Sequence, residues 1–156
     1  MNTALINNEL ELAYPDGFHQ MDGDELKKAF GIDKDLWGIW DTENHIIVSV
    51  MWHTSNKLLA SIASTKGLLE RVEKATAKAY AKASYKPIDT IETSACGEKA
   101  LGFRFAFQMQ DVAQTGQVMV FKHGATCYYI HCYERTELMD RSHPLFEQVF
   151  STIKLA

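Results

Sequence analysis

The sequence predicts an α+β protein, with an antiparallel sheet of six to seven strands and helices packed on that sheet. Several segments alternate apolar and polar side chains with the period of two that is typical of strands. Others repeat apolar side chains at the spacing of a helix. In chain order they give β-α-β-β-α-β-β-β-β-α. No linker rich in proline, glycine or serine interrupts the chain, so we expect a single domain over residues 1–156.

The first strand and the first helix are predicted over residues 9–14 and 24–30. In the strand, leucines alternate with polar side chains. Asp22 or Asp24 stands at the start of the helix, where a carboxylate accepts hydrogen bonds from free backbone amides. Gly31 follows the last turn, and glycine commonly ends a helix because it tolerates the left-handed conformation. Both ends of this helix are therefore marked in the sequence.

A hairpin is predicted from residues 36–41 and 46–53. Both segments are rich in aromatic and β-branched residues, and the polar residues 42–45 between them suit a turn. In the second segment the side chains of both faces are largely apolar or aromatic. We therefore expect this strand to be covered on both sides of the sheet.

Residues 55–84 carry a helical stripe of apolar and small side chains. A straight helix of this span would be roughly 40 Å long at about 1.5 Å per residue, which approaches the diameter of a domain of this size. We therefore expect a break or bend near residues 65–67. The stripe consists of Leu58, Leu59, Ile62, Leu69, Val72, Thr76, Ala79 and Ala83.

Four further strands and a last helix follow. Gly97, Gly116 and residues 122–124 are expected to form the turns of an antiparallel meander. The helix is expected to start near Ser142, with Pro144 in its first turn. The strands are predicted at residues 88–96, 101–109, 117–123 and 126–134. The second of them should bury the face that carries Leu101, Phe103, Phe105, Phe107 and Met109.

Charge and composition exclude several classes of function. The formal net charge is -4 and no more than two basic residues adjoin, so the surface lacks the clustered cations that bind nucleic acid. The longest apolar run, residues 46–52, is too short to cross a membrane. The N-terminus lacks the regions of an export signal, and the three cysteines form no C-x-x-C pair. We therefore expect a cytoplasmic protein without disulfides that binds neither nucleic acid nor membranes.

The element order and two segments resemble the Mog1/PsbP-like superfamily. The segments are Tyr14–Phe18, a turn after the first strand, and Phe146–Phe150 in the terminal helix. Within the superfamily, LKKAFG, LWGIWD and IIVSVMW resemble small bacterial members that mostly lack an assigned function. The resemblance implies a non-enzymatic binding module. One branch binds a small GTPase, another assists assembly of a photosynthetic complex, and a bacterial branch contains adaptor chaperones for secreted effectors.

The densest cluster of reactive side chains consists of His123, Cys127, His131 and Cys132. These residue types bind zinc, but in a strand Cys127 and His131 point to one face and Cys132 to the other, which does not suit tetrahedral ligation. Cys127 with His131 or His53 resembles a nucleophile and its base, yet nothing in the sequence indicates an activated thiol. We therefore predict no catalytic residue, no metal site and no cofactor, in a protein that is not an enzyme.

The leading functional hypothesis is a non-catalytic protein-interaction or adaptor module for an unknown protein or peptide partner. Aromatic residues are enriched in binding hot spots, and the predicted hairpin carries all three tryptophans. The rim of the hairpin and the sheet face beside it are the expected surface. The predicted binding residues are Trp37, Trp40, His53, Arg104 and Tyr129.

Two alternatives stay open. One is a small-molecule binding protein with a pocket between sheet and helices, lined by Phe103, Phe105 and Tyr129. The other concerns assembly: a free hairpin edge can pair with a second copy of the chain, so a homo-oligomer is a further expectation.

Overall fold

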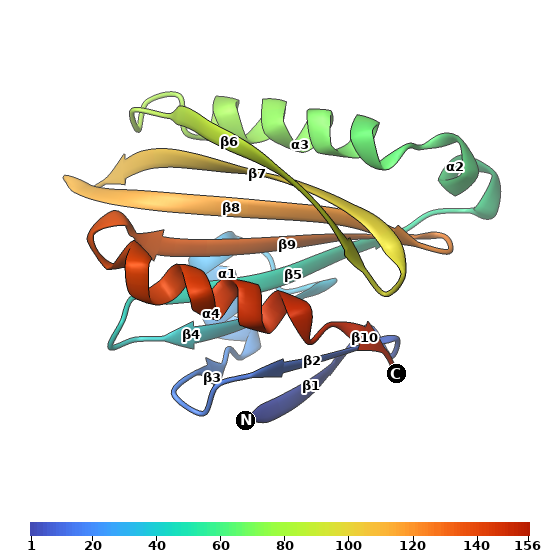
Figure 1. Ribbon diagram of the computed structural model, residues 1–156, viewed down its shortest axis with the longest axis horizontal. Coiled ribbons are helices and arrows are strands. Elements are labelled where there is room, and N and C mark those ends of the chain that lie inside the picture. Colours follow the sequence, from blue (N-terminus) through green and yellow to red (C-terminus); the bar gives the residue numbers. More distant parts are fainter.

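The computed structural model describes residues 1–156 and has the predicted α+β architecture (Figure 1). No helix is both long and apolar enough to cross a membrane. The helices are α1 (Gly23–Phe30), α2 (Lys57–Ile62), α3 (Thr65–Ala79) and α4 (Met139–Ser151), and a 3-10 turn (Thr136–Leu138) precedes α4. The strands are β1 (Asn2–Ile6), β2 (Leu10–Tyr14), β3 (His19–Gln20), β4 (Leu36–Asp41), β5 (Ile46–Thr54), β6 (Lys86–Ala95), β7 (Glu98–Met109), β8 (Val112–His123), β9 (Thr126–Arg135) and β10 (Lys154–Leu155).

The main sheet has seven antiparallel strands in the order β3-β4-β5-β9-β8-β7-β6. The predicted hairpin forms β4 and β5, and the predicted meander forms β6 to β9. β5 pairs with β9, for example at Met51 and Tyr129, and so joins the hairpin to the meander. Residues directly opposite one another share a face of the sheet, so this register decides which side chains meet.

A second sheet has three strands in the order β1-β2-β10. β10 comes from the C-terminal end of the chain and pairs with β2 near the N-terminal end. The Ala156 amide donates a hydrogen bond to the Glu9 carbonyl oxygen at 2.9 Å. Figure 1 shows this small sheet and α4 on the near side of the main sheet. β2 corresponds to the predicted first strand, whereas no strand is predicted at β1 or β10.

The two faces of the main sheet have separate cores. On the face that we call the α4 face, side chains of α4 and of the small sheet pack against β4, β5, β8 and β9, around the buried Phe121 and Tyr128. On the opposite face, the α3 face, α3 packs on β7 and β8 over Phe103 and Phe105. α1 packs on β4 on this same face.

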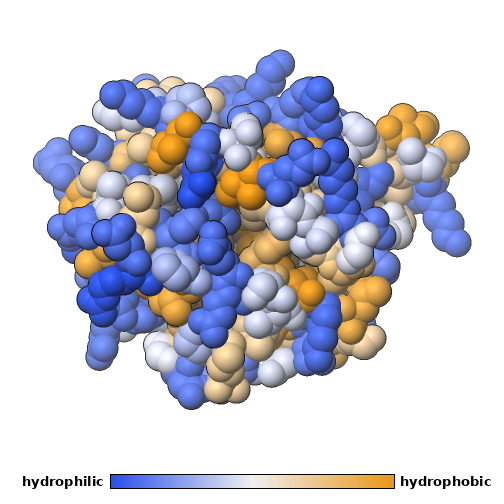
Figure 2. Space-filling model, in the orientation of Figure 1, coloured by the Kyte–Doolittle hydropathy of each residue, from blue (hydrophilic) through white to orange (hydrophobic).

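The long helical segment is broken close to the predicted place. Residues 63–64 separate α2 from α3, just before the expected residues 65–67, and the Ser64 hydroxyl caps α3. The start of the predicted apolar stripe is not buried, which corrects the expectation for α2. Figure 2 shows apolar surface at the upper right, where Figure 1 places α2. The exposed residues there are Leu58 (72%), Leu59 (56%) and Ile62 (73%).

Two other predicted boundaries are wrong. α4 starts at Met139, so Pro144 lies inside the helix and not in its first turn. Gly116 forms no turn, because it lies within β8. A Cβ atom at Gly116 would lie 2.3 Å from Cζ of Phe105. Glycine is needed there because the Phe105 ring lies against the backbone of the neighbouring strand.

β6 is the free edge strand at one side of the main sheet. Its side chains are mostly exposed, and its register with β7 shifts between Pro87 and Asp89. At the other edge, β3 has only two residues. The long free edge of the sheet is therefore irregular.

The N-terminus of α1 has a complete capping box. The Asp22 carboxylate accepts from the Glu25 amide, and the Glu25 carboxylate accepts from the Asp22 amide, both at 2.9 Å. We expect Asp22→Ala to lower the free energy of unfolding by about 1 kcal/mol, measured by urea denaturation. Asp24→Ala removes a carboxylate from the same turn but no capping bond, so its loss should be smaller. Equal losses would contradict the capping role.

Candidate functional site

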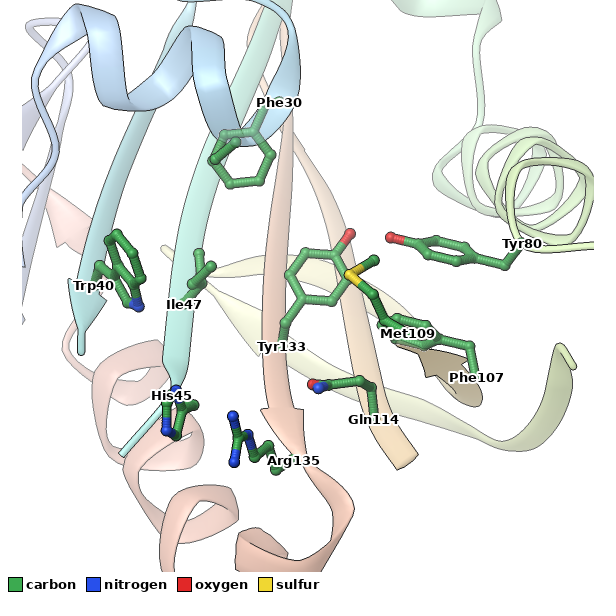
Figure 3. Close-up of a pocket in the computed structure, with 11 residues that line it drawn as sticks. Phe30, Trp40, His45, Ile47, Tyr80, Phe107, Met109, Gln114, Tyr133 and Arg135 are labelled. Atoms are coloured by element: carbon green, nitrogen blue, oxygen red, sulfur yellow. The ribbon is translucent and has the colours of Figure 1, made fainter. Parts of the chain in front are cut away.

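The α3 face of the main sheet is not fully covered by helices. α1 packs mainly on β4 and α3 mainly on β7 and β8, so no helix is centred on the two strands between them, β5 and β9. Neighbouring strands are about 4.8 Å apart, so the uncovered strip is about 10 Å wide. Figure 3 shows one end of this strip, with α1 on one side and α3 on the other. We call it the α1–α3 groove.

Four adjoining cavities make up the α1–α3 groove. Their volumes are about 340, 660, 170 and 530 Å³. Tyr133 lines the first three, whereas Arg71 and Tyr129 line both the second and the fourth. The groove therefore follows β9 from Arg135 to Cys127, beside α3.

Tyr133 lies at the centre of the groove floor. Its ring packs edge-on against Phe107 (centroids 6.2 Å apart) and lies nearly parallel to His131 (6.3 Å). Phe107 also packs on Tyr80, which follows α3 (4.4 Å). The hydroxyl groups of Tyr80 and Tyr133 point toward one another in Figure 3. Burial, with Tyr80 close by, raises the pKa of Tyr133, so its phenol stays neutral.

Three further titratable groups of the floor, His131, Tyr129 and Cys127, are neutral as well. Burial lowers the pKa of His131 to about 4, because an imidazolium ion would lose its hydration there. Burial also raises the pKa values of Tyr129 and Cys127, so both stay protonated at neutral pH. An effective general base has a pKa near the working pH, and a nucleophilic cysteine needs its thiolate form. The floor thus offers aromatic and polar contacts and no activated thiol.

The five residues predicted to bind a partner do not form one site. Trp40, His53 and Tyr129 line the α1–α3 groove. Trp37 lies three positions before Trp40 in the same strand, so its side chain points to the opposite face. Trp37 is 7% exposed and packs edge-on against Tyr14 in the core of the α4 face.

Arg104 also lies on the α4 face, away from the groove. Its guanidinium donates hydrogen bonds of 2.8 and 2.6 Å to the Asp89 carboxylate and lies 3.1 Å from Nε2 of His143. The structure therefore removes Arg104 and Trp37 from the groove. Trp40, His53 and Tyr129 stay predicted binding residues.

The cluster of histidines and cysteines is divided between the two faces. Cys127 and His131 lie on the α3 face and Cys132 lies on the α4 face, as their spacing indicates. His123, at the end of β8, lies 3.8 Å from the Glu9 carboxylate. No group of three or more His, Cys, Asp or Glu side chains is arranged to hold a metal ion.

The small-molecule pocket expected at Phe103, Phe105 and Tyr129 is not formed. Phe103 and Phe105 are 1% and 0% exposed and pack beneath α3. Neither lines any of the groove cavities, whereas Tyr129 does. The open space between sheet and helices lies on the neighbouring strands instead.

Several residues that form the groove are not among the predicted binding residues, above all Phe30, Tyr80 and Tyr133. One signal was present, because the period of two in the last predicted strand places Tyr133 on the same face as Tyr129 and His131. Phe30 and Tyr80 come from distant segments, and only the packing of α1 and α3 on the sheet brings them to one groove.

No protein-family model matches the sequence, and no curated protein matches it. Solved structures do match. The solution structure of cyanobacterial PsbP (CyanoP) from Synechocystis sp. PCC 6803 superposes with a TM-score of 0.72, at 17% sequence identity, over 99% of this chain and 92% of that chain. The chain has the PsbP-like fold.

Two further structures share this PsbP-like fold. LpqN, described as involved in cell envelope biogenesis of Mycobacterium tuberculosis, has a TM-score of 0.60 at 9% identity, over 94% of this chain and 83% of its own. PA94 of Pseudomonas aeruginosa, described as a putative regulator, has a TM-score of 0.56 at 9% identity, over 97% of this chain and 94% of its own. The predicted PsbP-like fold is thus confirmed.

Proposed function

We propose that the protein is a non-catalytic adaptor that binds a helical segment of a partner protein in the α1–α3 groove. The observation that carries this proposal is the strip of two strands on which no helix of the chain is centred, together with the cavities along it. An α-helix with its side chains is about 10–12 Å in diameter, and two strands span about 10 Å. One helix from another protein would therefore complete the layer that α1 and α3 begin.

The length and the lining of the groove support the same occupant. From Tyr129 to Arg135, β9 extends about 20 Å, which corresponds to about 13 residues of helix. Ile47, Met51 and Tyr133 supply an apolar floor along this length. A floor of this kind suits the apolar face of an amphipathic helix, which is a common mode of peptide recognition.

A small molecule is the alternative occupant. It would fit the end of the groove shown in Figure 3, a space of about 340 Å³ where Phe30, Trp40 and Tyr133 converge. This size and aromatic lining are typical of ligand pockets. Native mass spectrometry of the protein purified from the cells that make it separates the two hypotheses. A protein adduct supports the adaptor, and a small added mass supports the alternative.

Filling the groove should abolish binding of the partner. Ala75 of α3 is exposed and lines the groove, so Ala75→Trp places an indole there without disturbing the core. Lys74→Trp adds the same side chain at the adjacent position, which does not line the groove, and is the matched control. We expect A75W to lose the protein that co-purifies with wild type and K74W to retain it. Retention by a folded A75W, checked by circular dichroism, would contradict the proposal.

A further inference from the structure

The charges that line the α1–α3 groove are mainly positive. Lys34, Arg71 and Arg135 line it, and Asp35 is the one acidic residue that does. The whole chain has the opposite balance, with 20 acidic residues against 16 lysines and arginines. The groove is therefore a basic strip on an acidic protein.

The two arginines of this strip are available to a partner. Arg71 forms no ion pair within the chain. Arg135 has only Glu137, 3.9 Å away with a side chain 70% exposed, and a surface pair of this kind contributes little. Burial raises the pKa of Tyr129 on the groove floor, and the Arg71 guanidinium opposes that rise. The charge of Arg71 therefore acts on the floor of the groove.

Arg71 and Arg135 stand toward opposite ends of the groove. Arg71 lies on α3 and lines the same two cavities as Tyr129. Arg135 lies at the end of β9, beside His45 in Figure 3. The length of β9 between these two ends is about 20 Å. A guanidinium binds a carboxylate through two parallel hydrogen bonds, so each arginine can hold one acidic side chain in a defined position.

We infer that the helix bound in the groove is acidic, with its apolar face on Met51 and Tyr133 and with carboxylates about 13 residues apart that pair with Arg71 and Arg135. This inference rests on the proposed function and specifies the chemistry of the partner. A nucleic acid does not fit, because its phosphates recur along the whole strand. The floor between the two arginines is instead apolar and aromatic.

A library of random 16-residue peptides displayed on phage tests the charge preference. Clones are kept if they bind wild-type protein but not A75W, so that every kept peptide occupies the groove. We expect the kept peptides to be enriched in Asp and Glu relative to the starting library. Absence of that enrichment, or enrichment in Lys and Arg, would overturn the inference and leave the groove function intact. If no clone distinguishes wild type from A75W, both proposals fail.

Charge reversal then tests the two arginines. R71E/R135E should weaken binding of the kept peptides at least about tenfold, measured by fluorescence anisotropy, because two attractive contacts become repulsive. K74E/K78E changes the net charge by the same amount on α3 outside the groove, and it should bind within about twofold of wild type. Equal weakening by both variants would overturn the inference. Added sodium chloride should weaken wild-type binding and should not weaken binding by R71E/R135E.

Discussion

Phe105→Ala should lower the free energy of unfolding by about 3–5 kcal/mol. Phe105 has no exposed surface, and its ring lies against the backbone of Gly116 on the next strand. Truncation leaves a cavity that the backbone of Gly116 cannot fill. The protein then loses the free energy gained by removing the ring from water and the van der Waals contacts of the ring. Four aromatic rings surround it at centroid distances of 5.5 to 5.7 Å, those of Tyr80, Tyr85, Phe103 and Phe107.

Met109→Ala is the matched control for Phe105→Ala. Met109 lies on the same strand and the same face, but it is 54% exposed. Its truncation should cost less than about 1 kcal/mol, because little apolar surface is withdrawn from water there. Urea denaturation with a constant m-value measures both changes. Similar losses for the two variants would show that the core beneath α3 is not packed as described.

Glu134→Gln should stabilise the protein at alkaline pH and change little in mild acid. Glu134 is 2% exposed on the α4 face, where the Ser142 hydroxyl of α4 donates a hydrogen bond to its carboxylate. Burial raises the pKa of Glu134 to about 7, although Ser142 and the Arg104 charge oppose the rise. Glutamine keeps an oxygen that accepts from Ser142 and never carries the charge.

The direction of the change in stability with pH follows from the raised pKa of Glu134. The pKa of Glu134 is higher in the folded protein than in the unfolded chain, so its contribution to stability is largest below about pH 4.5 and is lost as the pH rises toward about 7. Wild type should therefore lose about 2–3 kcal/mol between about pH 5 and pH 8 through this group. His131 has the opposite effect. Its pKa is lowered to about 4, so its contribution is present above about pH 6.5 and is lost as the pH falls toward 4.

The difference between wild type and E134Q isolates the carboxyl group, because the His131 contribution is common to both. Urea denaturation at several pH values should give a difference that grows from under about 1 kcal/mol near pH 5 to about 2–3 kcal/mol near pH 8. Glu137→Gln, at an exposed carboxylate nearby, should show no such growth. A difference independent of pH would mean that folding does not raise the pKa of Glu134, so that its carboxylate is charged in the folded and the unfolded states alike over this range.

The sequence predicts those elements whose signals are local. α1 was found with both ends, because Asp22 and Gly31 act within one turn of the helix they cap. The β4–β5 hairpin and the meander were found because each strand pairs with its neighbour in the chain. β10 has two residues and pairs with Glu11 and Leu10 at the other end of the chain, so no local pattern identifies it.

A predicted helix boundary is wrong where a residue that usually marks the start of a helix has another role. Ser142-His143-Pro144 predicts the beginning of α4, but the helix starts at Met139 without a side-chain cap. Ser142 instead points inward, to Glu134 and to the Leu138 carbonyl oxygen. The sequence alone does not distinguish a serine that donates a hydrogen bond to a buried carboxylate from a serine that caps a helix.

The candidate site was predicted only in part, because its residues meet through tertiary packing. The strand period of two, applied to β4, already separates Trp37 from Trp40, and this test would have removed Trp37 from the predicted surface. Which face stays open depends on how far α1 and α3 extend over the sheet. Because α1 packs mainly on β4 and α3 on β7 and β8, the groove lies over β5 and β9. Neither the length of the helices nor the apolar pattern of the strands predicts this position.

The free edge formed by β6 has a consequence for behaviour at high concentration. Exposed edge strands are templates for intermolecular β-sheet growth and fibril formation. In β6, Pro87 has no amide hydrogen to donate, the ladder slips between Pro87 and Asp89, and Lys86 and Glu92 add charge along the strand. Natural proteins use these three devices against edge-to-edge aggregation. The longest strand with a free edge is thus a poor seed for amyloid-like stacking.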